Sequence, residues 1–293
     1  MIDRRIFMIG AAALAACAGA PAARSDAAQT STEVDFSPIL LRLGAGARLG
    51  LFAVDTGSGR TIRRDENSRF AMCSTFKAPL AAMVLEQVDR GRIGLAETIP
   101  VSRADLVNNS PAVEAALAGG RMSVEAICAA IVQVSDNAAA NLLLARLGGP
   151  SAFTAFVRRC GDDVTRLDRI EPEMNRVGRD DPRDTTSAAA MAGLMRALLL
   201  GDVLSPTSRA RLAGWMVGAT TGLNRLRGGL PPAWRAGDKT GTAGSFNHDI
   251  AIAWPPGRAP FLIASYIDAP AADHAGRNAA HAEAARLVVA SFR

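Results

Sequence analysis

The spacing of apolar positions changes character twice along this chain. Near the start, apolar stretches at 48–54 and 61–64, separated by the turn Gly57-Ser58-Gly59, predict a β-hairpin. From Ser74 to about Gly218 the apolar residues recur at helical spacing, with little strand pattern. Strand patterns return near the end, before an amphipathic helix that closes the chain. These last elements are predicted at 235–243, 249–254, 260–267 and 275–292.

Capping residues divide the helical middle of the chain. A short helix is also expected before the hairpin, at 35–44. In the middle, Ser, Thr and Pro mark the starts of helices, while Gly marks several ends. The predicted helices run from the Ser74 region to Asp89, from Ser123 to Val134, from Ala138 to Leu147, from Thr186 to Leu200, and onward from Ser205-Pro206. Residues 160–184, rich in Asp, Arg and Pro, predict a long ordered loop, and such loops are usually functional.

The order sheet, helices, sheet predicts a mixed fold. We expect an α/β (α+β) architecture in which five antiparallel strands share one sheet with flanking helices, and an all-α lobe is inserted between them. The discontinuous α/β domain would comprise 30–68 and 218–293, and the all-α domain 69–217. A cleft between the two lobes is the natural place for a site.

The N-terminus carries the pattern of an export signal. Arg4-Arg5 precede a short apolar run, Ile9 to Ala18, and the small residues Ala20-Pro21-Ala22 offer a cleavage site. This pattern, over 1–28, predicts a Sec-type or twin-arginine signal and a periplasmic or otherwise exported protein. A lipoprotein processing box, Leu14-Ala15-Ala16-Cys17, is the alternative, and it would leave Cys17 as a lipid anchor.

Composition excludes several classes of function. The net charge of +5 comes from scattered arginines, and aromatic residues make up only 5% of the chain, so nucleic-acid binding is not expected. No CxxC spacing occurs and the three histidines do not cluster, so neither a metal site nor a cofactor is expected. No apolar run is long enough for a transmembrane segment. Without a heptad or internal repeat, we expect a monomer.

Lysine is almost absent from this chain, and the positions of its two lysines indicate a chemical role. Of 33 Lys and Arg residues only Lys77 and Lys239 are lysines. Arginine is effectively never deprotonated, whereas a buried lysine can become a neutral amine. Either the chain needs amines at these positions, or a GC-rich genome has left two lysines by chance. Ser74 lies three residues before Lys77, so a helix would place hydroxyl and amine on one face.

Three short motifs follow one another along the chain, and their order is more informative than any one of them. They are Ser74-x-x-Lys77 at a predicted helix start, Ser135-Asp136-Asn137 between helices, and Lys239-Thr240-Gly241 on a predicted strand. Each alone is weak, but together they resemble the class A serine β-lactamases of the penicillin-recognising enzyme superfamily. The resemblance spans roughly residues 35–292. It implies a hydrolase without a cofactor whose substrates are small-molecule β-lactams, and it implies antibiotic resistance.

A fourth segment, Arg169 to Asn175, is similar to the omega loop of that family. By the resemblance, Glu171 deprotonates the water that hydrolyses the acyl-enzyme, Asn175 holds the same water, and the Glu171–Pro172 bond is cis. Arg169 and Asp184 match the pair that closes the neck of the loop. Without the other motifs, a surface carboxylate beside a proline would be the simpler interpretation of Glu171.

The resemblance also assigns the remaining roles in catalysis. Ser74 is the nucleophile, the backbone N–H groups of Ser74 and Thr242 form the oxyanion hole, and Ser135 relays a proton to the leaving nitrogen. The acylation base is either Lys77 or Glu171 acting through water.

Substrate binding is assigned in the same way. Asn137 binds the amide of the substrate's side chain. The substrate carboxylate is bound by Lys239, Thr240, Gly241, Thr242 and Arg225. Arg227 is the rival candidate to Arg225, and a simple surface charge is the alternative interpretation of Arg225.

Some positions depart from familiar members of the family. Asn109 stands where many have an aromatic residue at the cleft mouth. Cys73 has no partner because Ala243 follows Thr242, and Cys128 has none because Ala81 stands at the matching position. These departures leave the ranking of penicillins, cephalosporins and carbapenems open.

Two further functions stay open at this point. The first is a D-alanyl-D-alanine peptidase of the same superfamily, which the Glu171 segment argues against. The second is a β-lactam-binding sensor domain that is acylated without turnover. Members that use a Tyr-x-Asn motif are set aside, because the one tyrosine, Tyr266, lies on a late strand. A Ser-His-Asp triad is also disfavoured, because no Gly-x-Ser-x-Gly elbow occurs.

Overall fold

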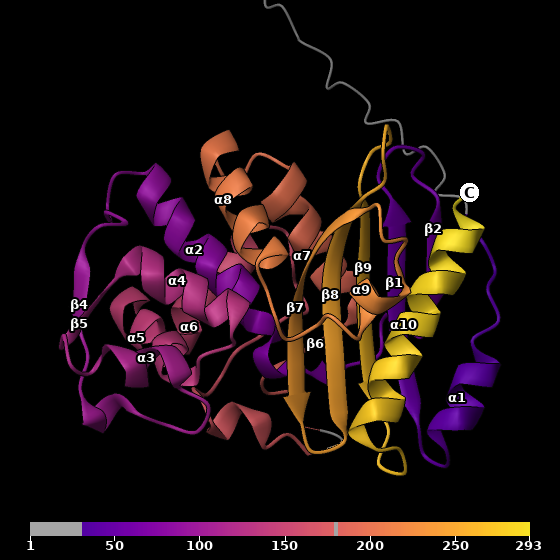
Figure 1. Ribbon diagram of the computed structural model, residues 1–293, viewed down its shortest axis with the longest axis horizontal. Coiled ribbons are helices and arrows are strands. Elements are labelled where there is room, and N and C mark those ends of the chain that lie inside the picture. The colour runs from indigo at the N-terminus through magenta and orange to yellow at the C-terminus, as the bar shows by residue number, and fades with distance from the viewer. Residues whose placement is uncertain (1–30, 179–180) are drawn as a thin grey trace, which may run out of the picture.

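A five-stranded sheet lies between a large group of helices on one side and a few helices on the other (Figure 1). The computed structural model describes residues 31–178 and 181–293. The predicted export signal at 1–28, with Cys17, lies outside the described residues. Within the described part, no helix is long and apolar enough to cross a membrane.

The sheet joins the first two long strands to the last three. Its strand order is β2-β1-β9-β8-β7, with every neighbouring pair antiparallel. The five-stranded antiparallel sheet and the mixed fold class are therefore as predicted. The strands are β1 (Arg48–Asp55), β2 (Thr61–Arg64), β7 (Arg235–Ala243), β8 (Phe246–Trp254) and β9 (Phe261–Asp268).

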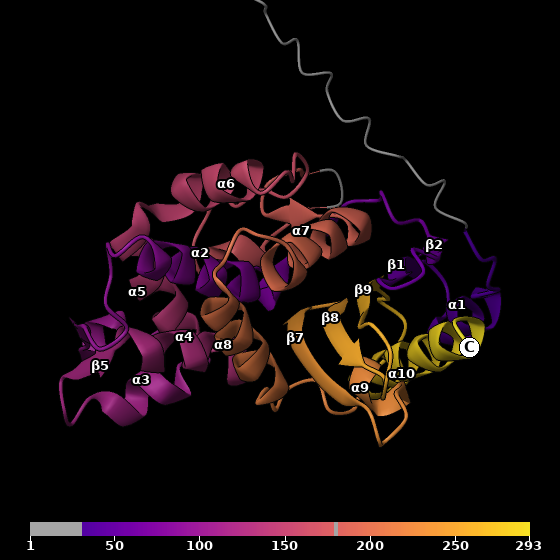
Figure 2. The same cartoon turned by 90° about the horizontal axis from the view of Figure 1, so that it is seen from above.

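Helices cover both faces of this sheet (Figure 2). On one face lie α1 (Ser37–Leu43), α9 (Leu226–Gly229) and α10 (His274–Ser291), over a core that includes Leu51, Ile263 and Val288. On the other face lie α7 (Ala188–Leu200) and α8 (Pro206–Val217). Because successive side chains of a strand point to opposite faces, both faces of the long strands need apolar residues, as their buried patterns record.

The helical side is built around α2 (Lys77–Asp89), which is buried almost all round. A helix that is apolar on every side belongs in a core, and α2 packs against α7, α8 and three further helices. These are α4 (Val124–Gln133), α5 (Asn137–Leu147) and α6 (Gly149–Arg159). A short helix, α3 (Pro111–Ala116), also belongs to this side. Two pairs of short strands are β3 (Phe70–Ala71) with β6 (Thr185–Thr186), and β4 (Thr98–Pro100) with β5 (Arg121–Ser123). The 3₁₀ turns are Cys73–Phe76, Arg103–Asp105 and Glu173–Asn175.

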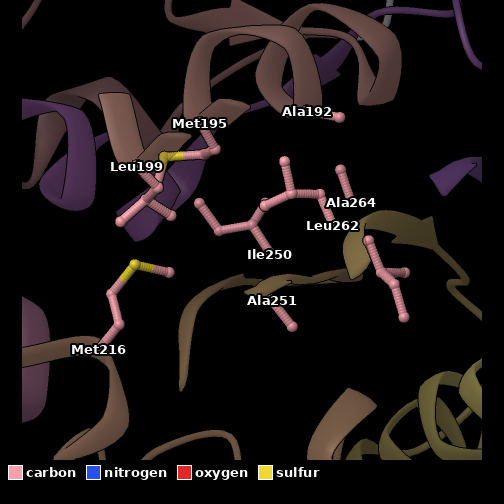
Figure 3. Close-up of a pocket in the computed structure, with 9 residues that line it drawn as sticks. Ala192, Met195, Leu199, Met216, Ile250, Ala251, Leu262 and Ala264 are labelled. Carbon is pink, nitrogen blue, oxygen red and sulfur yellow. The ribbon is translucent and has the colours of Figure 1, made fainter. Parts of the chain in front are cut away.

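A small apolar void lies where α7 and α8 meet the sheet (Figure 3). Met195 and Leu199 approach it from α7 and Met216 from α8, while Ile250 and Leu262 project from the strands. Its lining is completed by Ala192, Ala251, Ile263 and Ala264. No titratable side chain reaches it, so the void is a packing feature of the core.

The structure differs from the sequence expectations at several boundaries. Helix α6 had no predicted counterpart, although Pro150 stands in its first turn. The side chain that caps α7 belongs to Ser187, because Thr186 is taken up in strand β6. Strand β8 begins at Phe246 rather than Asp249, since the hairpin turn before it is only two residues long. The proposed limits of the two domains, 30–68 with 218–293 and 69–217, stay a prediction.

Candidate active site

Ser74 lies in the 3₁₀ turn that leads into α2, and Lys77 is the first residue of that helix. The Lys77 Nζ lies 3.0 Å from Ser74 Oγ, so the spacing of three residues does bring hydroxyl and amine together. The turn is braced by Thr75, whose Oγ1 donates to the Met72 carbonyl at 2.7 Å and lies 3.1 Å from Tyr266 Oη.

Lys77 is fully buried and surrounded by oxygen atoms. Its Nζ donates to the Ser135 carbonyl at 2.8 Å and to Oδ1 of Asn137, and lies 3.2 Å from Glu171 Oε1. Burial is the largest influence and lowers the pKa of Lys77, while the negative charge of Glu171 opposes that shift. The amine is therefore easier to deprotonate than a lysine in water.

The Ser135-Asp136-Asn137 loop joins α4 to α5 in an unusual conformation. Ser135 has φ 60°, in the left-handed region that few residues other than glycine adopt. Asp136 caps α5 by accepting from the Ala139 N–H at 2.8 Å, and its other oxygen accepts from two N–H groups of α3. These bonds fix the loop so that the side chains of Ser135 and Asn137 both reach Lys77.

Lys239 approaches Ser135 from the opposite side of the cleft, on β7. Its Nζ donates to Ser135 Oγ at 3.0 Å and to the Thr240 carbonyl at 2.8 Å. Burial, followed by the positive charge of Lys77, holds the pKa of Lys239 well below the usual value. The two lysines of the chain thus flank one serine.

Gly241 allows β7 to pass directly beside the nucleophile turn. A Cβ at this position would lie 2.9 Å from the Met72 carbonyl oxygen, 3.1 Å from Cys73 Cβ and 3.2 Å from the Ser74 nitrogen. Most side chains cannot be accommodated at such distances. The glycine of the motif is therefore required by close backbone approach.

Arg225, not Arg227, faces the cleft. Arg225 donates to Thr242 Oγ1 at 2.7 Å and to the carbonyl of Gly241 at 3.2 Å, and it lines the cleft. Arg227 instead donates to Asp238 at 3.1 Å and to the Ala219 carbonyl at 2.9 Å. The geometry thus separates the two candidates that the sequence left open.

Glu171 is held on the other wall by the loop that follows α6. Its Oε1 lies 3.4 Å from Ser74 Oγ, and its Oε2 accepts from Asn175 Nδ2 at 2.6 Å. Asn141 brackets its backbone, donating to the carbonyl at 2.9 Å and accepting from the N–H at 3.0 Å. The Glu171–Pro172 bond is cis, as expected.

The neck of this loop is closed by the expected ion pair. Arg169 Nε lies 2.6 Å from Asp184 Oδ2. The other oxygen of Asp184 accepts from the backbone N–H groups of Asp168 and Arg169, at 2.7 and 2.9 Å. A fully buried carboxylate with several donors holds its loop in one arrangement.

The structure thus brings together all eleven residues singled out from the sequence. Lys77, Lys239 and Gly241 lie behind the surface, while the other eight line the cleft. Those eight are Ser74, Ser135, Asn137, Glu171, Asn175, Arg225, Thr240 and Thr242. The cleft is completed by Asn108, Asn109, Val134, Pro172, Arg176, Thr221, Ala243 and His274.

Sequence reasoning missed one supporting residue that it could have found. Asn141 stands four positions after Asn137 on the same helix, so the two amides share a face that points at the site. His274 and Arg176 offered no such signal, because nothing in the local sequence ties them to the other motifs.

The assembled geometry places a buried amine and a carboxylate within reach of one hydroxyl, an arrangement that can activate a serine as a nucleophile. Residues 36–292 match the model of the beta-lactamase enzyme family. The chain is 44% identical to beta-lactamase AST-1 of Nocardia asteroides, over 98% of this chain and 95% of that protein. It is 44% identical to beta-lactamase L2 of Stenotrophomonas maltophilia, over 94% and 90% of the respective chains.

Solved structures agree with these matches. An ancestral class A β-lactamase, called GNCA, is 51% identical with a TM-score of 0.84, over 88% of this chain and 100% of that chain. A β-lactamase from Xanthomonas campestris pv. campestris is 45% identical with a TM-score of 0.84, over 88% and 97%. The chain therefore belongs to the class A serine β-lactamases.

Proposed function

We propose that this enzyme hydrolyses β-lactams through an acyl-enzyme on Ser74, which a water activated by Glu171 then hydrolyses. One observation carries the proposal: Ser74 Oγ lies 3.0 Å from the Lys77 amine and 3.4 Å from the Glu171 carboxylate. A single hydroxyl therefore has a base available for acylation and another for deacylation. The names of the relatives AST-1 and L2, both called beta-lactamases, support the same substrate class.

The contacts of Lys77 suggest how Ser74 loses its proton. The Ser135 carbonyl and Asn137 Oδ1 can only accept hydrogen bonds from Lys77, so they occupy two of its N–H groups. A neutral amine has only two N–H groups, which leaves its lone pair for the hydroxyl of Ser74. Lys77 then accepts the proton as Ser74 Oγ bonds to the lactam carbonyl carbon. Glu171, 3.2 Å from the same Nζ, offers the competing route through water.

The lactam C–N bond breaks in the second half of acylation, and the nitrogen must receive a proton. Ser135 Oγ lies 3.5 Å from Lys77 and 3.0 Å from Lys239, so it connects both amines to the cleft. The backbone N–H groups of Ser74 and Thr242 would stabilise the developing oxyanion. The close approach of β7 at Gly241 supports this placement.

Substrate binding follows from the charges at one end of the cleft. Lys239, Thr240, Gly241, Thr242 and Arg225 offer a cationic, hydroxyl-rich subsite for the carboxylate that β-lactams carry. Asn137 would bind the amide of the acyl side chain. Deacylation would then use Glu171, with Asn175 2.6 Å from its carboxylate as the second holder of water.

Two finer expectations form part of the proposal, and one rival function stands against it. Penicillins and cephalosporins are the expected substrates, with carbapenems as an extension suggested by Thr242 and Arg225. Export through the signal at 1–28 would place the enzyme where β-lactams act, giving resistance. A D-alanyl-D-alanine peptidase or an acylated sensor is the second candidate, which the position of Glu171 beside Ser74 disfavours.

Ring opening and intact mass, followed together on the mature chain with excess penicillin, test the proposal. Many ring openings per enzyme with little lasting adduct are the expected result. One opening per enzyme with a persistent penicilloyl mass would favour the peptidase or sensor. The absence of both ring opening and a penicilloyl mass would refute acylation at Ser74.

A further inference from the structure

The side chain of Asn109 connects the mouth of the cleft to the base of the site. Its Nδ2 donates to the Ser135 carbonyl oxygen at 2.9 Å, and the same oxygen accepts from Lys77 Nζ at 2.8 Å. Its own backbone carbonyl accepts from the Asn137 N–H at 2.9 Å. One residue thus holds both ends of the Ser135-Asp136-Asn137 loop.

The backbone conformation explains why an asparagine can do this. Asn109 has φ 56° and Ser135 has φ 60°, so both occupy the left-handed region. Asparagine tolerates that region better than most residues, whereas serine adopts it only where neighbours hold it. The hydrogen bond from Asn109 supplies part of the restraint on Ser135. An aromatic side chain has no amide with which to make this bond.

We propose that Asn109 is a positioning residue for acylation, because its amide fixes the carbonyl oxygen that holds the Lys77 amine beside Ser74. This inference rests on the proposed function of Lys77. A carbonyl oxygen has two lone pairs, and Asn109 occupies one of them. Lys77 is left with the other, so the direction of its N–H bond is set. Asn109 acts through Ser135 and Lys77 and need not touch the substrate.

The same contact influences the charge of Lys77. The hydrogen bond from Asn109 makes the Ser135 carbonyl oxygen, which Asn109 and Lys77 share, a weaker acceptor for a charged Lys77. It therefore favours the neutral amine of Lys77. The charged or titratable groups that also act on Lys77 come from every neighbouring segment: Glu171 from the loop, Asp136 at the cap of α5, Cys73 in the nucleophile turn and Lys239 on β7. None of these would be altered by a change at Asn109. A shift in the pH dependence of acylation would therefore report on the shared oxygen.

Asn109→Gly tests the side-chain amide alone, because it removes the amide and keeps the backbone conformation. Glycine keeps the left-handed conformation, so only the bond to Ser135 is lost. We expect the acylation rate constant to fall about 3- to 10-fold, the range for one net hydrogen bond, with deacylation unchanged. The acid limb of the acylation pH profile should move to higher pH. Asn109→Asp should show a larger fall, since a carboxylate loses the donor and also places a negatively charged oxygen against the Ser135 carbonyl oxygen.

Asp65→Gly is the matched control. Asp65 is also a non-glycine residue in the left-handed region, with φ 41°, and it does not line the cleft. It should leave both rate constants and the pH profile unchanged. An Asn109→Gly enzyme with acylation within about twofold of wild type and an unmoved acid limb would refute the proposal, as would a change confined to deacylation. If wild type itself formed no acyl-enzyme, the proposed function would fail first, and with it the basis of this inference.

Discussion

Lys239 donates from Nζ to Oγ of Ser135 at 3.0 Å, across the cleft from the only other lysine of the chain. Both lysines are fully buried, and both lie within 3.5 Å of the same hydroxyl. Arginine could supply the charge but not a removable proton. This arrangement argues that the two lysines are retained for their chemistry, and it makes Ser135 the junction between them.

Ser135→Ala should therefore slow acylation more than binding. The variant removes the hydroxyl that links both amines to the leaving nitrogen, while the carboxylate subsite at Thr240 and Arg225 stays intact. We expect the acylation rate to fall by roughly 10²- to 10⁴-fold, the usual contribution of a positioned proton donor. Stopped-flow acylation with a chromogenic cephalosporin measures it. An unchanged rate would remove Ser135 from the proton route.

Glu171→Gln should separate the two half-reactions. Glutamine can keep the contact with Asn175 Nδ2 through its amide oxygen but cannot accept a proton from water. Penicillin should then acylate Ser74 and remain attached, giving a stable mass increase and one ring opening per enzyme. Ser74→Ala is the control and should give no adduct. Turnover at the wild-type rate in Glu171→Gln would contradict the assignment of the deacylation base.

The extent to which the sequence predicted this site can be explained residue by residue. Ser74 and Lys77 are neighbours on one turn, so their contact depends on local helix geometry alone. The meeting of Lys239 with Ser135 depends on how β7 packs against the helical side, and only the resemblance to a family implied it. The preference for Arg225 over Arg227 came from the resemblance to a family, because the turn of α9 decides which side chain faces the cleft.

The fold was predictable to a similar extent. The long strands have clear apolar patterns, so the sheet could be foreseen. Helix α6 has a marked apolar face, yet the glycines and proline at its start resemble a loop in the sequence. The role of Asn109 was hidden, since the bond from its side chain depends on two separate loops meeting.

Asp249→Asn should make the protein more stable, and increasingly so as the pH rises. Asp249 and Asp238 lie on one face of neighbouring strands, and one oxygen of each has no hydrogen-bond partner among the described residues. Burial, followed by the negative charge of Asp238, raises the pKa of Asp249 well above the ordinary value for an aspartate. Between the ordinary pKa and the raised one, the folded state therefore binds more protons than the unfolded state, and wild-type stability falls as pH rises through this window.

Asparagine at this position cannot titrate, and it can still accept from the Leu226 N–H that Asp249 Oδ2 accepts from at 3.0 Å. Urea unfolding at about pH 5 and about pH 8 should show the stability difference between variant and wild type growing as the pH rises. Asp55→Asn is the control of opposite sign. Burial raises the pKa of Asp55, but hydrogen bonds from Ser58 and Gly57 and the charge of Arg258 outweigh it and lower the pKa overall. A stability difference for Asp249→Asn that did not change with pH would contradict a raised pKa for Asp249.

Gly241→Ala tests whether the close approach of β7 to the nucleophile turn matters for catalysis. The added Cβ would meet the Met72 carbonyl oxygen at 2.9 Å and the Ser74 nitrogen at 3.2 Å. Both are backbone atoms, which cannot swing aside as the end of a long side chain can, so strand and turn must separate. Because Ser74 and Thr242 supply the two proposed oxyanion donors from these two segments, their spacing should widen.

We expect acylation by penicillin to fall by about 10²- to 10³-fold, as when one oxyanion donor is lost, with far-ultraviolet circular dichroism unchanged. Gly214→Ala is the matched control, since Gly214 lies within helix α8 and a Cβ there meets nothing within 4 Å. That control should keep full activity and gain about 0.4–1 kcal/mol of stability. A Gly241→Ala enzyme that acylates as fast as Gly214→Ala would show that the two donors do not depend on the contact between β7 and the turn.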